Sequence, residues 1–162
     1  VLLGGGIHLI DLMISFFNQK PEFVQSHSSN FFLKKKNRIQ DFSQSNFFFK
    51  NGGLGKITAN FGCVHNHQHV LKIYGTKKTF LYDDMGARIF SKRDPYKGTI
   101  IKKKTKLYEN KSCLLPKFFS KINSRESKKE HILKEFDLIA SCLYADQSSK
   151  KKGKKIKIRY FR

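Results

Sequence analysis

The sequence predicts an α+β fold, with an open, largely antiparallel sheet that carries helices on one face. Short segments rich in β-branched and aromatic residues follow one another through the middle of the chain, and turn signals separate them. Segments with helical spacing lie on both sides, at residues 7–17, 114–122 and 127–145. A chain of 162 residues is long enough for one domain with its own core.

The first helical segment, residues 7–17, is apolar nearly all round, which is typical of a buried helix. The polar exceptions are His8, Asp11 and Ser15, whose spacings of three and four place them on one stripe. Polar groups on a buried helix need partners or line a cavity. The pattern therefore predicts that this stripe either contacts polar partners or lines a cavity, and Asn18 and Pro21 end the helix.

The clearest pair of strands lies within residues 43–62, where Asn51-Gly52-Gly53 supplies a turn with positive φ angles. The consecutive residues Phe47, Phe48 and Phe49 put an aromatic ring on each face of the sheet. Only one face can pack on the helices, so we expect the other face to be a subunit interface. Alternatively, the segments at 33–38 and 92–104 fold over that face.

Further strands are expected at residues 22–28, 69–74, 79–82, 87–90 and 99–107, and a last one alternates at Ile156, Ile158 and Tyr160. The helix at 114–122 should turn Phe118, Phe119 and Ile122 inward. The helix at 127–145 begins with a capping box formed by Ser127 and Glu130. Its apolar face is expected to comprise Ile132, Phe136, Ile139 and Leu143.

The chain is strongly basic, with 33 Lys and Arg against 12 Asp and Glu and a net charge of +21. One interpretation is a small basic nucleic-acid-binding module. However, the cations are mostly lysines spread over many segments, and the composition matches translation of an AT-rich genome. We favour this second interpretation and expect no specific nucleic-acid partner. The basic run at 150–155 is interpreted as a solvated connection before an edge strand.

Cys63, Cys113 and Cys142 are odd in number and widely spaced, which favours free thiols in a reducing cytoplasm. No apolar run is long enough to span a membrane, so we expect no membrane partner. The chain begins with Val1 rather than Met, and its first motif is already in progress at residue 3. We therefore expect residues 1–162 to form a single substrate-binding and oligomerisation domain, truncated at its amino terminus.

Several motifs resemble one family of oxidoreductases. The opening residues Val1–Leu12 read Val-Leu-Leu-Gly-Gly-Gly-Ile-His-Leu-Ile-Asp-Leu, and later come Phe-Phe-Phe-Lys-Asn-Gly (47–52) and Leu-Lys-Ile-Tyr-Gly-Thr (71–76). The remaining motifs follow in the same sequence order. They are Thr79-Phe80-Leu81 and the closing segments at 145–148 and 152–158. The chain resembles the carboxy-terminal domain of the Gfo/Idh/MocA (glucose–fructose oxidoreductase, inositol dehydrogenase) family. Gly6, His8 and Asp11 match the second half of that family's Gly-Gly-Gly-x-x-x-Asp-x-Gly-x-His-x-x-Asp pattern.

The resemblance implies an oxidoreductase that transfers hydride between a nicotinamide cofactor and a secondary alcohol of a sugar, sugar nucleotide or polyol. NAD or NADP would be held by a Rossmann domain that precedes this one, because the chain shows no strand, Gly-x-Gly-x-x-Gly turn and helix in succession. We therefore expect this chain alone to bind no cofactor and to be inactive. The family's catalytic Asp falls at Gly4, so any proton relay must differ.

The resemblance makes His8 the candidate catalytic base, since imidazole is the usual base near neutral pH. Asp11 is the candidate for orienting the substrate, although a structural pairing of His8 with Asp11 remains the alternative. His65, His67 and His69 alternate along the chain. We take His65 and His67 as candidate substrate contacts. A metal site is the less favoured alternative, because no Cys or acidic residue lies beside them at ligand spacing.

Overall fold

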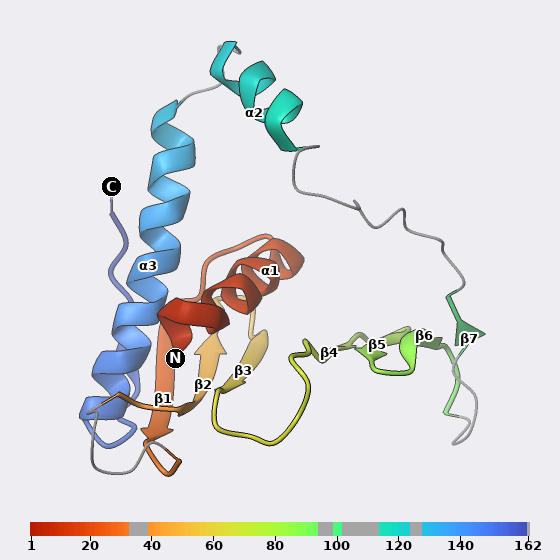
Figure 1. Ribbon diagram of the computed structural model, residues 1–162, viewed down its shortest axis with the longest axis horizontal. Coiled ribbons are helices and arrows are strands. Elements are labelled where there is room, and N and C mark those ends of the chain that lie inside the picture. Colours follow the sequence, from red (N-terminus) through yellow and green to blue (C-terminus); the bar gives the residue numbers. More distant parts are fainter. Residues whose placement is uncertain (33–38, 94–98, 102–113, 124–127, 162) are drawn as a thin grey trace. The chain divides into compact units, whose positions relative to one another are not determined.

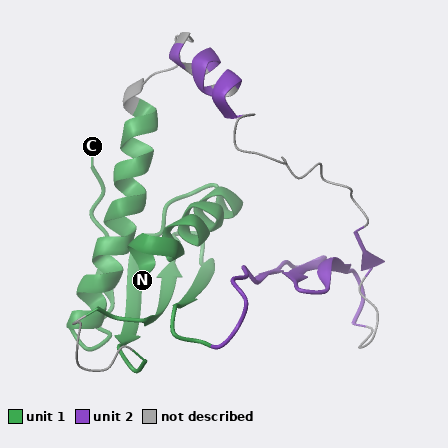
Figure 2. Ribbon diagram, in the orientation of Figure 1, with its two compact units in different colours: residues 1–63, 126–162 green, residues 64–125 purple. Residues whose placement is uncertain are grey.

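The computed structural model describes residues 1–32, 39–93, 99–101, 114–123 and 128–161 (Figure 1). The chain divides into two compact units, one made of residues 1–63 and 126–162 and the other of residues 64–125 (Figure 2). The predicted loop at 33–38 and the predicted cap at Ser127 lie outside the described residues, as does most of the segment at 92–107. Each unit is described by itself.

The first unit is an antiparallel four-stranded sheet with two helices on one face. Its strands are β1 (Phe23–Ser29), β2 (Phe42–Phe48), β3 (Leu54–Asn60) and β8 (Ile156–Lys157), in the order β3-β2-β1-β8. Burial alternates along β2 and β3, as expected for a sheet with one covered face. The covering helices are α1 (Ile7–Phe17), entered through a π-helical turn at Leu2–Gly6, and α3 (Lys128–Lys150).

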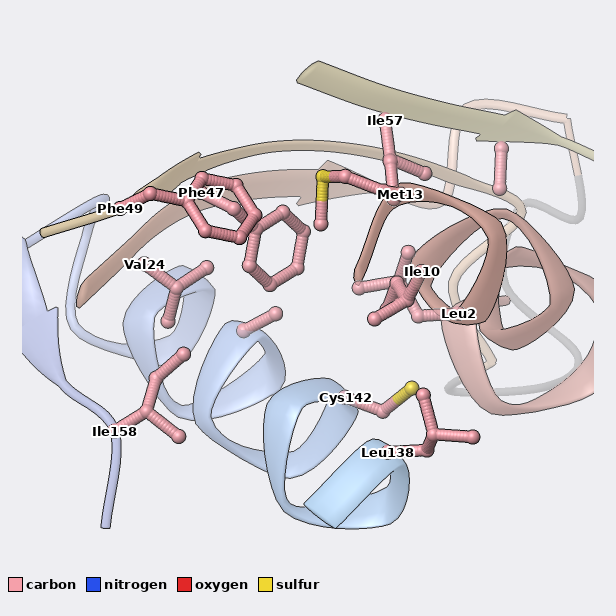
Figure 3. Close-up of a cluster of buried hydrophobic side chains, with 12 residues drawn as sticks. Leu2, Ile10, Met13, Val24, Phe47, Phe49, Ile57, Leu138, Cys142 and Ile158 are labelled. Carbon is pink, nitrogen blue, oxygen red and sulfur yellow. The ribbon is translucent and has the colours of Figure 1, made fainter. Parts of the chain in front are cut away.

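The core of this unit lies between the covered face and the two helices (Figure 3). Val24 and Phe47 from the sheet and Ile10 from α1 are fully buried, and Cys142 of α3 is 1 % exposed. Burial raises the pKa of the Cys142 thiol to about 11, so this cysteine is an inert core residue. Cys63 is an exposed free thiol, whereas Cys113 lies outside the described residues.

The packing face of α3 is not the one predicted from its apolar stripe. Ile132, Phe136, Ile139 and Leu143 are 38–53 % exposed, whereas the buried face carries Leu138 together with small and polar residues. Ser148 Oγ accepts a hydrogen bond from the Ser26 backbone N–H (2.9 Å) and donates one to the Lys154 carbonyl (2.7 Å). The prediction was wrong because this part of the covered face is rich in serine, so small side chains and hydrogen bonds make the contact.

The open face of the same sheet has an apolar row at one end, two polar rows beside it, and the mixed row Ser29–Phe42–Asn60 at the other end. Phe23, Phe48 and Leu54 lie opposite one another across β1, β2 and β3. The Lys155 ammonium lies 3.9 Å from the centroid of the Phe48 ring. The next rows on this face are polar, namely Gln25–Asn46–Lys56 and His27–Gln44–Thr58. The large apolar side chains of the open face therefore gather at one end of the sheet, and Phe42 is the further aromatic residue at the other end.

The second unit contains the antiparallel meander of β4 (Leu71–Tyr74), β5 (Thr79–Asp83), β6 (Gly86–Phe90) and β7 (Thr99–Ile100), in that order, together with helix α2 (Leu114–Asn123). None of its described residues is fully buried. Phe118, Phe119 and Ile122 of α2 are 46–59 % exposed, so the prediction that they point inward was wrong. That prediction assumed one sheet covering every helix, whereas the strands divide between two sheets.

The α+β class with open, antiparallel sheets and helices is confirmed. The predicted bounds of the first helix, residues 7–17, agree with α1. The last strand is shorter than predicted, because β8 ends at Lys157 and Tyr160 lies beyond it. No helix in the described part of the chain combines the length and apolar character that a membrane span requires.

Candidate functional site

The turn before α1 lies close to β3, and its glycines make this approach possible. Gly6 is buried, and a Cβ placed on it would lie 2.7 Å from Leu2 Cδ2 and 3.7 Å from the Ala59 side chain. A Cβ on Gly5 would lie 3.0 Å from the ring of Phe61. The glycine run therefore serves helix–sheet packing and positions the first turn of α1, where His8 lies.

The polar stripe of α1 lies on the exposed side of the helix. His8, Asp11 and Ser15 are all exposed, and so are Leu12 and Phe16 beside them. The prediction that α1 is buried nearly all round was wrong, because the helix contacts the sheet through Ile10 and Met13 and leaves its opposite side uncovered. The stripe thus presents an imidazole, a carboxylate and a hydroxyl on an accessible surface one turn apart.

The imidazole and the carboxylate of this stripe are not paired with each other. Among the described residues neither side chain has a hydrogen-bond or ion-pair partner. Ser15 Oγ donates to the backbone carbonyl of Asp11 (3.0 Å) and so leaves the Asp11 carboxylate uninvolved. The structural alternative, in which His8 and Asp11 only satisfy one another, is thereby disfavoured, and both groups remain available to a substrate.

The other candidate histidines belong to the segment between β3 and β4, in the second unit. His65 Nδ1 lies 2.9 Å from the Asn66 carbonyl, and His65 Nε2 lies 3.8 Å from Asp84 Oδ2. The amide of Gln68, in its better orientation, donates to Asp84 and accepts from His65. The rings of His67 and His69 meet edge to face with centroids 5.0 Å apart. All three histidines are exposed, and Asp84 is an acidic neighbour not anticipated from sequence spacing.

Within the described ranges, no three His, Cys, Asp or Glu side chains are placed to hold a metal ion. The glycine-rich segments do not fit a dinucleotide either. Gly4–Gly6 lie in the π-helical turn against Phe61, and Gly52, with a φ of 83°, forms the β2–β3 turn. Gly4–Gly6 are thus packed against an aromatic ring and Gly52 lies within a hairpin, and neither arrangement is the open glycine turn that cradles a pyrophosphate.

A buried polar network at the other end of α1 was not anticipated. Lys20 Nζ lies 2.5 Å from Asp137 Oδ2, and the Tyr160 hydroxyl donates to the Pro21 carbonyl (2.7 Å). Burial raises the pKa of Tyr160 to about 12, the hydrogen bond with Ser141 opposes the rise, and the Asp137 carboxylate adds to it. Asp137 lies in α3 among several other charged residues, and no sequence signal marks it as the buried one. The network ties the carboxy-terminal segment to the start of β1.

Comparison with known protein families finds a match to the part of the chain that includes the glycine turn, the polar stripe and strands β1, β2 and β3. The profile described as the GFO/IDH/MocA C-terminal domain matches residues 1–81, which is half of the chain. The chain belongs to the GFO/IDH/MocA family. The matched region of this GFO/IDH/MocA domain includes the glycine turn, His8, Asp11 and the histidine segment. A comparison with curated protein sequences finds no match.

Several solved structures with the same fold are described as oxidoreductases or dehydrogenases. An oxidoreductase from Klebsiella pneumoniae shares 12% identity with a TM-score of 0.69, and the alignment covers 99% of this chain and 50% of that one. Levoglucosan dehydrogenase, solved with NADH and levoglucosan, has 13% identity, a TM-score of 0.70, and coverage of 97% and 50%. The WlbA dehydrogenase from Bordetella pertussis, solved with NADH and UDP-GlcNAcA, has 15% identity, a TM-score of 0.63, and coverage of 99% and 45%. The chain thus spans about half the length of the structures it matches.

Proposed function

We propose that this chain is the carboxy-terminal, substrate-binding domain of an NAD- or NADP-dependent oxidoreductase that acts on a secondary alcohol of a sugar, sugar nucleotide or polyol. The observation that carries the proposal is the family match, which includes the exposed His8–Asp11 stripe. Two matched dehydrogenases were solved with NADH together with a carbohydrate or a sugar nucleotide. The cofactor would belong to the remaining half of the parent enzyme, because the glycine segments here do not fit it.

In this proposal His8 is the catalytic base that takes the proton from the substrate hydroxyl. It lies in the first turn of α1, exposed and without a described partner, so its ring can approach a substrate. Asp11, one turn further on, orients the substrate by accepting a hydrogen bond from a neighbouring hydroxyl. Gly4 stands where the family pattern has its Asp, so the proton would leave His8 by way of solvent.

His65 and His67 are proposed as further substrate contacts. Imidazole nitrogens can donate to or accept from sugar hydroxyls, and the Asp84–Gln68–His65 set adds a carboxylate and an amide. In this proposal the two imidazoles contact the substrate directly and hold no metal ion.

The open face of the first sheet is proposed as the contact between copies of the protein. The apolar row of Phe23, Phe48 and Leu54 would form its centre, and the amide rows beside it would supply the hydrogen bonds of a polar rim. We further propose that the parent enzyme works in the cytoplasm, where free thiols such as Cys63 remain reduced.

The decisive experiment is the His8→Ala substitution in the full-length parent enzyme, assayed with NAD and NADP against a panel of sugars and sugar nucleotides. We expect turnover to fall about a hundredfold or more, the usual scale for a lost general base. Ser15→Ala, two turns along the same stripe, is the control and should keep its turnover. Unchanged turnover in His8→Ala would refute the catalytic role of His8.

A further inference from the structure

The carboxylate of Asp137 is buried in the first unit, and only one of its oxygens has a partner. The Asp137 side chain is 7 % exposed, and its Oδ2 accepts a hydrogen bond from Lys20 Nζ at 2.5 Å. Its Oδ1 is also buried and bonds to no other group in the described part of the chain. Taking a carboxylate out of water is costly, and a single ion pair rarely compensates for the whole cost. Stability alone therefore does not account for the Lys20–Asp137 pair.

Lys20 belongs to the short segment that joins α1 to β1, and this segment is held from two sides. The Lys20 ammonium lies between the Asp137 carboxylate on α3 and the ring of Tyr160, whose centroid is 5.0 Å away. The next residue, Pro21, is fully buried, and its carbonyl accepts a hydrogen bond from the Tyr160 hydroxyl at 2.7 Å. These contacts fix the path of the chain where it leaves the carboxyl end of α1.

Fixing both ends of α1 sets the rotation of the helix about its own axis. The buried residues of α1 are Ile10 and Met13, and its amino end is held by the close approach of Gly6 to β3. His8 and Asp11 lie on the exposed side. Side-chain ends lie about 5–6 Å from a helix axis, so a rotation of about 10° moves them by roughly 1 Å. A displacement of that size between reacting groups can lower a rate by about a hundredfold.

We propose that Asp137 is a positioning residue for the polar stripe of α1: it holds Lys20 and thereby fixes the direction in which His8 and Asp11 point. This inference rests on the proposed function, which gives the stripe its part in the reaction. Asp137 acts through Lys20 and α1 and makes no contact with the substrate. An ion pair suits this task better than an apolar contact, because its hydrogen bond defines both a distance and a direction. Each of these contacts lies within the first unit.

The test separates position from stability in the full-length parent enzyme. Asp137→Asn keeps the shape of the side chain and removes its charge. The apolar pair Lys20→Met/Asp137→Val leaves no buried charge without a partner, so we expect it to fold as stably as the wild type. Lys20→Arg keeps a cation that can bond to the carboxylate. Lys151→Met is the matched control, because Lys151 is exposed and has no ion-pair partner in the described part of the chain.

For Asp137→Asn and for the apolar pair we expect kcat to fall by about tenfold or more, with a smaller change in the substrate KM and an unchanged NADH dissociation constant. Lys20→Arg should keep most of the turnover, and the control should behave as the wild type. In Asp137→Asn, hydrogen exchange should become faster in α1 but not in β2, because only the helix loses a contact.

A normal kcat in a stably folded apolar pair would overturn the proposal, since the ion pair would then serve stability alone. Exchange that rises equally in α1 and β2 would overturn it as well. The apolar pair decides the matter if Asp137→Asn does not fold. A wild-type parent enzyme that oxidises no sugar with NAD or NADP would instead count against the proposed function, and the exchange of α1 would still show whether Asp137 holds the helix.

Discussion

Replacing Gly55 with alanine tests how closely α1 packs on β3. A Cβ at this position would lie 2.1 Å from Met13 Sδ and 3.0 Å from Met13 Cγ. Carbon and sulfur atoms pack at about 3.5–4.0 Å, so Met13 would have to move by roughly 1.5 Å. Met13 is only 9% exposed and packs in the core, so it has little room to turn. Such overpacking costs about 1–3 kcal/mol.

The lower backbone entropy of alanine in the unfolded chain offsets up to about 1 kcal/mol of that cost. We therefore expect a net loss of about 1–2 kcal/mol, which urea unfolding followed by circular dichroism would measure. Gly4→Ala is the control, because a Cβ on Gly4 would lie 3.6 Å from its nearest neighbour, an ordinary contact. Met13→Ala combined with Gly55→Ala should show a favourable coupling energy, since the shorter side chain makes room. A Gly55→Ala protein as stable as the wild type would show that α1 does not approach β3 as closely as described.

Three further outcomes are expected. Because burial raises the pKa of Tyr160 in the folded protein from its usual 10.0 to about 12, the contribution of Tyr160 to stability is complete below pH 10 and is lost as the pH rises toward 12. Tyr160→Phe should flatten that alkaline loss by on the order of 2 kcal/mol in unfolding titrations, and an unchanged slope would contradict the assignment. With a net charge of +21, the protein should bind nucleic acid weakly at low salt and release it at physiological salt; tight, sequence-selective binding at physiological salt would favour the nucleic-acid alternative. Phe48→Glu should abolish the proposed association of copies in sedimentation experiments without unfolding the protomer, whereas association unchanged by the substitution would exclude the open face as the contact.

The local elements could be predicted because their signals are carried by neighbouring residues. The hairpin turn at Gly52 and the bounds of α1 depend on positive φ angles and on 3.6-residue spacing, which a sequence shows directly. Membership of the family could also be inferred, from the order of motifs around His8 and the Asn51-Gly52 turn.

The orientation of the helices could not be predicted in the same way. Hydrophobic spacing on α3 selects Phe136 and Ile139 as the inward face, but the sheet beneath the helix is lined by Ser26 and Ser45, which favour small partners. The inward face of a helix therefore depends on what the opposite layer offers, and that is information from distant segments. The buried carboxylate of Asp137 was missed for the same reason, because its partner Lys20 is 117 residues away.

The discontinuity of the first unit has a consequence for the time at which it can fold. Strand β1 pairs with β8, and the Tyr160 hydroxyl bonds to the Pro21 carbonyl, 139 residues earlier in the chain. The whole second unit is synthesised between these two halves. During translation α1 and the strands β1, β2 and β3 therefore leave the ribosome before α3 and β8. Until α3 and β8 follow, Val24 and Phe47 lack the cover that these elements provide. Such a domain is expected to fold late and slowly, and to need protection of its exposed core during synthesis.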